Sequence, residues 1–267
     1  MFELPVLTRP PRLKHSFSRI STFAEQCELR YALDAVMPRT PSSPEQARGT
    51  HVHAMAEAVA RELCREPPSG LTAALEAGAA VAGPIEGDTK DLYLSRLAVF
   101  FAAHLPQRGS IEFWVDALRA PDGRDAQKFL ARPWCGKVDL VAVDGEGQLI
   151  CDFKTVSGPR NMKTASQAQR SLQLGSYCLA TGQKRAAFVY LHPYHDLTVV
   201  KVKFSDGELN KMFDRLVVYC RTAEKRWETG GWSVAPPDHP LCSSKWCPWW
   251  SSCGGTGKGV AELVAGL

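Results

Sequence analysis

One apolar stretch that holds three charges constrains the fold most. From Trp134 to Val156 the sequence reads WCGKVDLVAVDGEGQLICDFKTV, with two apolar runs on either side of Asp-Gly-Glu-Gly. Runs of this kind joined by turn residues predict a β-hairpin. The hairpin carries Asp139, Asp152 and Lys154, and burial of such groups without partners is costly. These charges must therefore find partners.

The period of a strand predicts how these groups meet. Asp152 and Lys154 are two residues apart and face the same side of the sheet, and pairing across the turn places Asp139 near Asp152. Two close carboxylates repel unless a cation lies between them, and hard divalent ions such as Mg²⁺ take oxygen ligands, including a carbonyl such as that of Phe153. Lys154 is then placed to orient or activate a water, or to stabilise charge on a phosphate. A salt bridge between Asp139 and Lys154 at a sheet edge, with Asp152 solvated, is the alternative.

The other patterns predict a mixed α/β chain. Its 267 residues, 45% of them hydrophobic, suffice for a large core. The order of elements predicts a central mixed sheet flanked by helices. We expect helices over 18–36, 45–64, 91–104, 164–181 and 205–229, a short Ala-rich helix within the loop 66–90, and strands over 110–118, 186–194 and 197–204 beside the hairpin.

Charge is distributed unevenly. The net charge of +4 is too small to indicate a nucleic-acid partner by itself. From Phe153 to His195, however, there is no Asp or Glu, while six Lys and Arg occur. Three of them are candidates for contacts to a DNA backbone from a flexible basic loop: Arg160, Lys163 and Arg170. A solvated basic face is the alternative.

The lack of a recognisable signal peptide and the pattern of cysteines both favour a reducing compartment. The N-terminus lacks the apolar run of a signal peptide, and no stretch of about 18 apolar residues predicts a membrane span, so we expect a cytoplasmic protein. The nine cysteines are an odd number and unevenly placed. Metal ligation or burial is favoured over a disulfide framework.

At this point the sequence resembles a known family. GKVDLVAVDGEGQLICDFKT resembles motifs II and III of the PD-(D/E)XK nuclease superfamily, and is most similar to its RecB-like and Cas4-like exonuclease branch. RGTHVHAMAE, IEFWV and QLGSY agree with that branch in order and spacing, so the resemblance spans residues 18–253. It implies a restriction-endonuclease-like core and a metal-dependent DNA exonuclease.

The resemblance also implies roles for single residues. Mg²⁺ or Mn²⁺ would be held by His53, Asp139, Asp152 and the carbonyl of Phe153. Catalysis would depend on Asp139, Asp152, Lys154, Gln173, Tyr177 and Glu112, with Asp116 as the alternative to Glu112. Helical spacing is consistent with two of these assignments, because His53 shares a face with Glu57 and Gln173 shares one with Tyr177. The imidazole of His53 would favour Mn²⁺ over Mg²⁺. The alternative is that His53 binds no metal and is hydrogen-bonded to a local partner.

Three thiols lie within twelve residues near the C-terminus, one short of a four-thiolate site. In Cas4-like and AddB-like nucleases a cysteine of an early helix joins three C-terminal ones, and the resemblance implies a [4Fe–4S] cluster on Cys27, Cys242, Cys247 and Cys253. The spacing here is C-x4-C-x5-C, whereas the family usually has C-x2-C-x5-C. One alternative is zinc bound by the same thiolates. The other is metal-free, buried thiols that pack among Trp246, Trp249 and Trp250.

The function expected from these observations is phosphodiester hydrolysis from single-stranded DNA ends in recombination, repair or phage DNA processing. We expect a single nuclease domain over 1–267, with a helical part at 16–65, the nuclease core at 110–203 and a cysteine clasp at 232–257. DNA is the expected partner, alongside a recombination or helicase protein and a second copy of the chain. A non-catalytic DNA-binding or assembly module is the main alternative, and a restriction-type endonuclease is a third.

Overall fold

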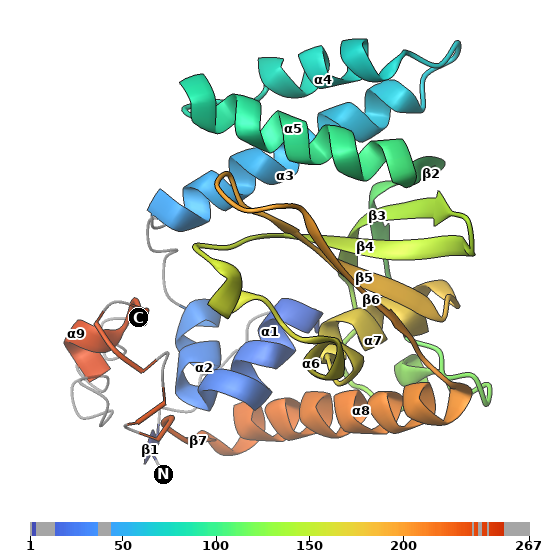
Figure 1. Ribbon diagram of the computed structural model, residues 1–267. Coiled ribbons are helices and arrows are strands. Elements are labelled where there is room, and N and C mark those ends of the chain that lie inside the picture. Colours follow the sequence, from blue (N-terminus) through green and yellow to red (C-terminus); the bar gives the residue numbers. More distant parts are fainter. Residues whose placement is uncertain are drawn as a thin grey trace. The chain divides into compact units, whose positions relative to one another are not determined.

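The predicted hairpin lies inside a five-stranded mixed sheet of order β2-β3-β4-β5-β6 (Figure 1). β4 and β5 run parallel, and the other neighbours are antiparallel. The expected fold class, a mixed sheet flanked by helices, is confirmed. The strands are β2 (Leu105–Val115), β3 (Gly136–Asp144), β4 (Gly147–Thr155), β5 (Arg185–Leu191) and β6 (Thr198–Lys203).

The computed structural model describes residues 2–3, 14–36, 44–236, 238–239, 242–244 and 246–253. The chain divides into two compact units. The sheet unit consists of 42–115 and 136–209, and the clasp unit consists of 1–41, 116–135 and 210–267. Most of the expected arm at 1–15 and the end of the expected clasp, 254–257, lie outside the described residues.

In the sheet unit, helices pack on both faces of the sheet. One face carries α3 (Pro44–Leu63), α4 (Leu71–Ala80) and α5 (Gly87–Ala103), whose apolar side chains form a single core with alternate residues of β3, β4 and β5 (Figure 1). The other face contacts α7 (Leu172–Thr181). Strand residues therefore alternate between two buried surfaces, which explains why apolar residues occur on both faces of the hairpin.

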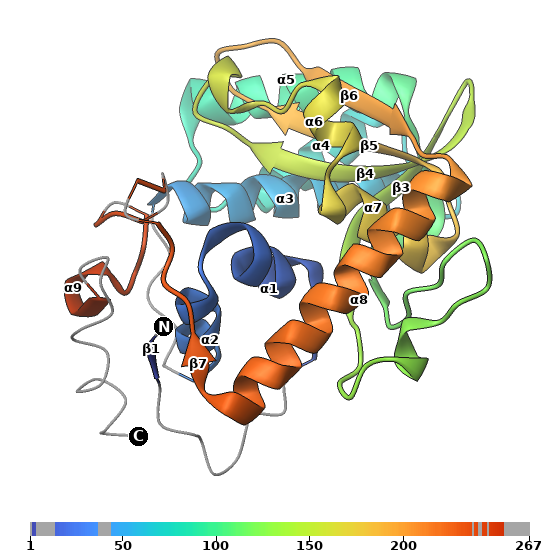
Figure 2. The ribbon, with the colours of Figure 1, turned by 90° about the horizontal axis from the view of Figure 1, so that it is seen from below.

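The clasp unit is built around α2 (Glu28–Val36) and α8 (Asp206–Thr229), the latter entering this unit at Asn210. Figure 2 shows β7 (Gly231–Trp232) passing beside α2, and β7 pairs with β1 (Phe2–Glu3). Tyr31, Trp227 and Trp232 form an aromatic cluster with centroid distances of 4.8–6.3 Å. Smaller elements of this unit are α1 (Phe17–Ser21), η1 (Thr22–Gln26), η2 (Ala126–Lys128) and α9 (Trp250–Cys253).

The helix expected over 18–36 is interrupted, which corrects the sequence prediction. After the π-helical turn η1, Cys27 takes an extended conformation, with φ −160° and ψ 122°, and α2 begins at Glu28. Tertiary hydrogen bonds replace those of a continuous helix, since Leu29 N donates to Ser233 O (3.0 Å) and Glu28 Oε2 accepts from Ser233 N (3.0 Å). These bonds to a distant segment have no counterpart in local helix propensity.

The helix expected over 164–181 is also two helices, α6 (Ala165–Gln169) and α7. Thr164 and Gln167 form a capping box for α6, and Ser171 leaves the helical conformation before α7 begins. The predicted stop at Gly182 is confirmed by its left-handed backbone, φ 73°. η3 (Pro159–Asn161) is a short 3₁₀ turn. In the described part of the chain, no helix has the length and hydrophobicity needed to cross a membrane.

Candidate active site

The hairpin holds two carboxylates where its strands part. β3 and β4 pair from Asp144–Gly147 to Leu140–Cys151. Beyond that point the Phe153 N–H donates to Oδ2 of Asp139 (2.9 Å). The same register places Asp139 opposite Asp152, so the turn geometry expected from the sequence brings the two carboxylates together.

Asp152 is buried and each of its oxygens has a partner. Oδ1 accepts a 2.6 Å hydrogen bond from Nε2 of Gln173, and Oδ2 lies 2.6 Å from the Lys154 ammonium. Nε2 of Gln173 also lies 3.2 Å from the hydroxyl of Tyr177 one turn along α7. The helix thus fixes the orientation of the carboxylate, and Lys154 neutralises part of its charge.

The pKa values of Asp139 and Lys154 are both raised, for different reasons. Burial, and then the charge of Asp152, raise the pKa of Asp139 well above its usual range. Burial lowers the pKa of Lys154, but the charges of Asp152 and Asp139 more than offset it, so that the pKa lies above its usual value. Lys154 is therefore an ammonium at neutral pH, suited to stabilising anionic charge rather than accepting a proton.

His53 approaches the same carboxylate from α3. Its Nδ1 lies 3.5 Å from Oδ2 of Asp139, and its ring meets Phe153 edge-on at 6.3 Å. Burial lowers the pKa of His53, which favours the neutral imidazole needed for a metal ligand. His53, Glu57, Glu112, Asp139 and Phe153 contribute to the lining of a cavity of about 10 Å³, roughly the space of one water.

Glu112 lies on β2 beside this cavity. Ile111 pairs with Leu140 and Phe113 with Val138, so the register places Glu112 next to Asp139. Its φ of 46° is in the left-handed region, which is strained for a residue with a side chain and often marks a functional position. Its carboxylate forms an ion pair with Lys137.

Lys137 is a charged neighbour that the sequence reasoning missed. It lies two residues before Asp139 on β3, so strand periodicity could have identified it. Asp116, the alternative to Glu112, follows the end of β2 and belongs to the clasp unit. Asp116 therefore does not share a strand face with Glu112.

The basic side chains expected to contact DNA are exposed around the end of β4 and α6. Arg160 lies in η3, and Lys163 stands 5.5 Å from the centroid of Phe188. Arg170 folds back onto Ser166, with hydrogen bonds of 3.0 and 3.2 Å. Lys163 thus lies against β5, the strand next to the one that carries Lys154, whereas Arg170 is oriented by its own helix.

The donor chemistry around Asp139 fits a divalent cation. The buried carboxylate of Asp152 faces the partly buried one of Asp139, whose pKa is raised first by burial and then by the charge of Asp152. A cation between them would relieve that repulsion, and an imidazole and a backbone carbonyl are adjacent. Within the described ranges, no set of three His, Cys, Asp or Glu side chains is already arranged as a metal site.

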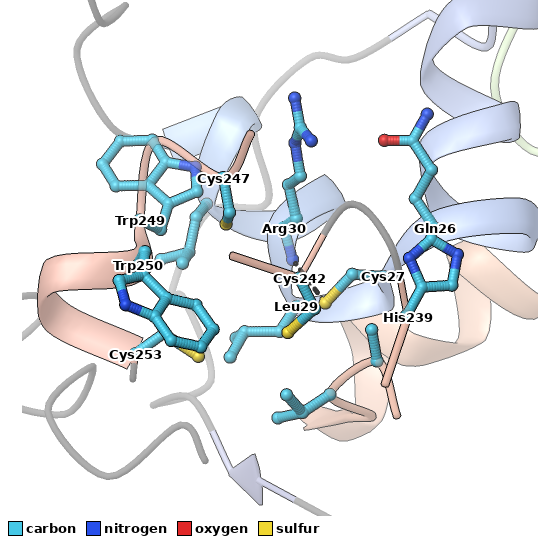
Figure 3. A pocket seen from close by; sticks show the side chains of 13 residues that line it. Gln26, Cys27, Leu29, Arg30, His239, Cys242, Cys247, Trp249, Trp250 and Cys253 are labelled. Atoms are coloured by element: carbon cyan, nitrogen blue, oxygen red, sulfur yellow. Dashed lines mark hydrogen bonds between the residues drawn. The ribbon is translucent and has the colours of Figure 1, made fainter. Parts of the chain in front are cut away.

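The four cysteines of the expected clasp line one pocket of about 20 Å³ in the clasp unit (Figure 3). The Arg30 backbone N–H points at Sγ of Cys27 (3.4 Å). Trp249 Nε1 donates to Asp34 (2.7 Å), which ties the C-terminal segment to α2. Burial raises the pKa of Cys242 and of Cys247, and a bound cation would favour the thiolate form of both. The pocket lining contains all four residues: Cys27, Cys242, Cys247 and Cys253.

Comparison with known proteins identifies the family. The sequence model of the PD-(D/E)XK nuclease superfamily matches residues 14–254. The chain belongs to this superfamily. No curated protein sequence matches it, and two solved structures are similar to it at low identity. A putative exonuclease from Eubacterium rectale is 12% identical with a TM-score of 0.49, covering 87% of this chain and 86% of its own. An alkaline exonuclease from Laribacter hongkongensis is 14% identical with a TM-score of 0.37, and the match covers 82% of this chain and 92% of the exonuclease chain.

Proposed function

We propose that this PD-(D/E)XK protein is a metal-dependent DNA exonuclease of the RecB-like and Cas4-like branch. The observation that carries the proposal is the group formed by Asp139, Asp152 and Lys154. Gln173 orients the carboxylate of Asp152 in this group. An ammonium beside two carboxylates that favour a cation is suited to hydrolysis of a phosphodiester.

Each side chain has a distinct task in this proposal. Asp139, Asp152, His53 and the Phe153 carbonyl would hold Mg²⁺ or Mn²⁺, which when bound supplies Lewis-acid activation of the hydrolytic water. Lys154 stabilises the charge that develops on the phosphoryl oxygens. Gln173 orients Asp152, Tyr177 supports Gln173, and Glu112 adds negative charge to the cavity. Arg160, Lys163 and Arg170 would bind the DNA backbone.

The domain assignment is part of the same proposal. Residues 110–203 would form the catalytic core and 16–65 the helical part, with 232–257 as the clasp of a single nuclease domain. DNA ends, preferentially single-stranded, would be the substrate, in recombination, repair or phage DNA processing.

Dependence on DNA ends tests the exonuclease assignment. We expect linear single strands to be degraded in Mg²⁺ or Mn²⁺, while a closed circle of the same sequence stays intact, because an end-processing site needs a free terminus. Gel analysis of end-labelled and circular DNA measures this. Cleavage of the circle at a comparable rate would indicate an endonuclease, and DNA binding without cleavage in either metal would favour the non-catalytic module.

We further propose that the four cysteines hold a metal centre, either [4Fe–4S] or zinc. The support is the convergence of two distant segments of chain on one pocket lined by four thiols. Such a centre would connect α2 to the C-terminal segment and add its binding free energy to folding.

Replacing Cys247 with Ser should release this metal. Anaerobically purified protein should contain about four iron atoms per chain with visible absorption, or about one zinc without colour. The Cys247→Ser variant should lose the metal and unfold at a lower temperature. Cys135→Ser, outside the pocket lining, serves as the matched control and should keep the metal. Metal-free wild-type protein with an unchanged melting temperature in Cys247→Ser would leave buried thiols as the explanation.

A further inference from the structure

A groove of about 530 Å³ lies at the N-terminal end of α3, away from the small cavity beside Glu112. Its walls come from three places in the sheet unit: the first turns of α3, the segment before α5, and the loop that follows β5. The side chains that matter for its chemistry are Arg48, Glu86 and Tyr194. None of them belongs to the proposed catalytic group.

Tyr194 is a large aromatic side chain held out into solvent. It is 72% exposed, yet its loop is fixed at several points. The Tyr194 backbone N–H donates to Nδ1 of the buried His192 (2.9 Å), and Arg96 Nε donates to the carbonyl of His195 (2.8 Å). A fixed, exposed ring offers a flat surface at little cost in conformational entropy.

Arg48 places a cation beside this ring. It is exposed on the first turns of α3, and both Arg48 and Tyr194 are close enough to the hydroxyl of Tyr93 to act on it electrostatically. A guanidinium next to an exposed aromatic ring can bind a phosphate while the ring stacks on a base. Glu86 is the one acidic residue of the groove lining in the described chain, and its carboxylate can accept a hydrogen bond from a base amino group.

The groove lies close to the ends of the strands that carry the proposed catalytic residues. Thr155 and Leu191 are register partners at the ends of the parallel strands β4 and β5, and Tyr194 follows Leu191 by three residues. At Gly49, next to Arg48, α3 comes so close to Thr155 that a Cβ would lie 3.0 Å from its Oγ1. Arg48 and His53 are five residues apart on one helix, or about 7.5 Å along its axis.

We propose that this groove is a subsite for single-stranded DNA, in which Tyr194 stacks on a base and Arg48 binds a phosphate one or two nucleotides from the cleaved bond. The proposal rests on the proposed function for the position of the cleaved bond. The lining supports this occupant, because the guanidinium of Arg48 and the exposed ring of Tyr194 lie in the same groove. Stacking on Tyr194 needs an unpaired base, so this subsite would favour single strands.

Binding measured without hydrolysis tests the subsite. With EDTA present, fluorescence anisotropy of a labelled single-stranded oligonucleotide should give a Kd about 5- to 100-fold weaker for Tyr194→Ala, and a nearly unchanged Kd for Tyr194→Phe. Arg48→Ala should weaken binding and lower the slope of log K against log salt by about 0.7. Arg65→Ala, an exposed arginine paired with Glu62, is the matched control and should bind as the wild type does.

The outcomes separate this inference from the nuclease assignment. In Mg²⁺ or Mn²⁺, Tyr194→Ala should raise KM and leave kcat nearly unchanged, and an oligonucleotide of abasic residues should bind both proteins equally. A Kd for Tyr194→Ala within about twofold of the wild type would overturn the subsite even if the protein cleaves DNA. Conversely, loss of binding in Tyr194→Ala with no cleavage by the wild type would leave the subsite standing and remove the nuclease function.

Discussion

Lys154→Met is expected to slow DNA hydrolysis by about 10²- to 10³-fold, the effect of removing one preorganised charge from a transition state. The ammonium lies 2.6 Å from Oδ2 of Asp152, and the neighbouring carboxylates hold its pKa above the usual value. It therefore remains charged across the neutral range and needs no proton transfer to act. The loss should appear mainly in kcat, measured on linear single-stranded DNA at saturating metal.

A second lysine provides the matched control. Lys184 is a half-exposed lysine that forms an ion pair with Asp206 (2.8 Å) at the start of β5, on the same sheet unit. Lys184→Met removes an identical charge and should leave kcat within about twofold of wild type, since exposed pairs contribute little. DNA binding in EDTA should be similar for both variants. Full activity in Lys154→Met would remove this lysine from the mechanism.

The hairpin of the candidate site could be predicted because all its determinants are local. The turn at Gly145-Glu146 sets the register, and strand periodicity then places Asp139, Asp152 and Lys154 with no further information. Gln173 and Tyr177 were predictable as a pair for the same reason, since helical spacing aligns them. The hydrogen bond from Gln173 to Asp152 depends on packing of α7 against the sheet, and nothing in the local sequence indicated it.

Other features depend on contacts between distant segments and could not be read locally. Cys27 leaves the helical conformation because the flanking chain is bound to Ser233, more than 200 residues away. Glu112 has a left-handed backbone just after the stretch Pro106–Ile111 in which β2 changes register against β3, and no residue preference signals that irregularity. The groove beside Tyr194 combines three separate segments, so no single stretch of sequence reveals it.

Asp139→Asn should stabilise the metal-free protein while abolishing hydrolysis. Burial and the charge of Asp152 raise the pKa of Asp139 to about 7, above the value of about 3.9 in an unfolded chain. The folded state therefore binds the proton more tightly, and the ionised group costs folding free energy increasingly as pH rises from about 4 through 7. Asparagine has no charge to bury, and its amide oxygen can still accept the Phe153 N–H. We expect a gain of about 1 to 3 kcal/mol at pH 8 and about a third of that gain at pH 5.

Asp144→Asn, five residues further along β3, should have the opposite effect. Its carboxylate is paired with Arg185 and Lys201, both at 2.9 Å, and the Arg185 hydrogen bonds hold the pKa of Asp144 far below its usual value. Its contribution is fully present above the unfolded pKa and is lost only as pH falls through the depressed folded pKa, so its removal should cost about 1 to 3 kcal/mol at both pH 5 and pH 8. Urea midpoints in EDTA at the two pH values measure both variants. If Asp139→Asn were instead destabilising by the same amount at both pH values, the carboxylates of Asp139 and Asp152 would not repel each other. The reason for placing a cation between them would then disappear.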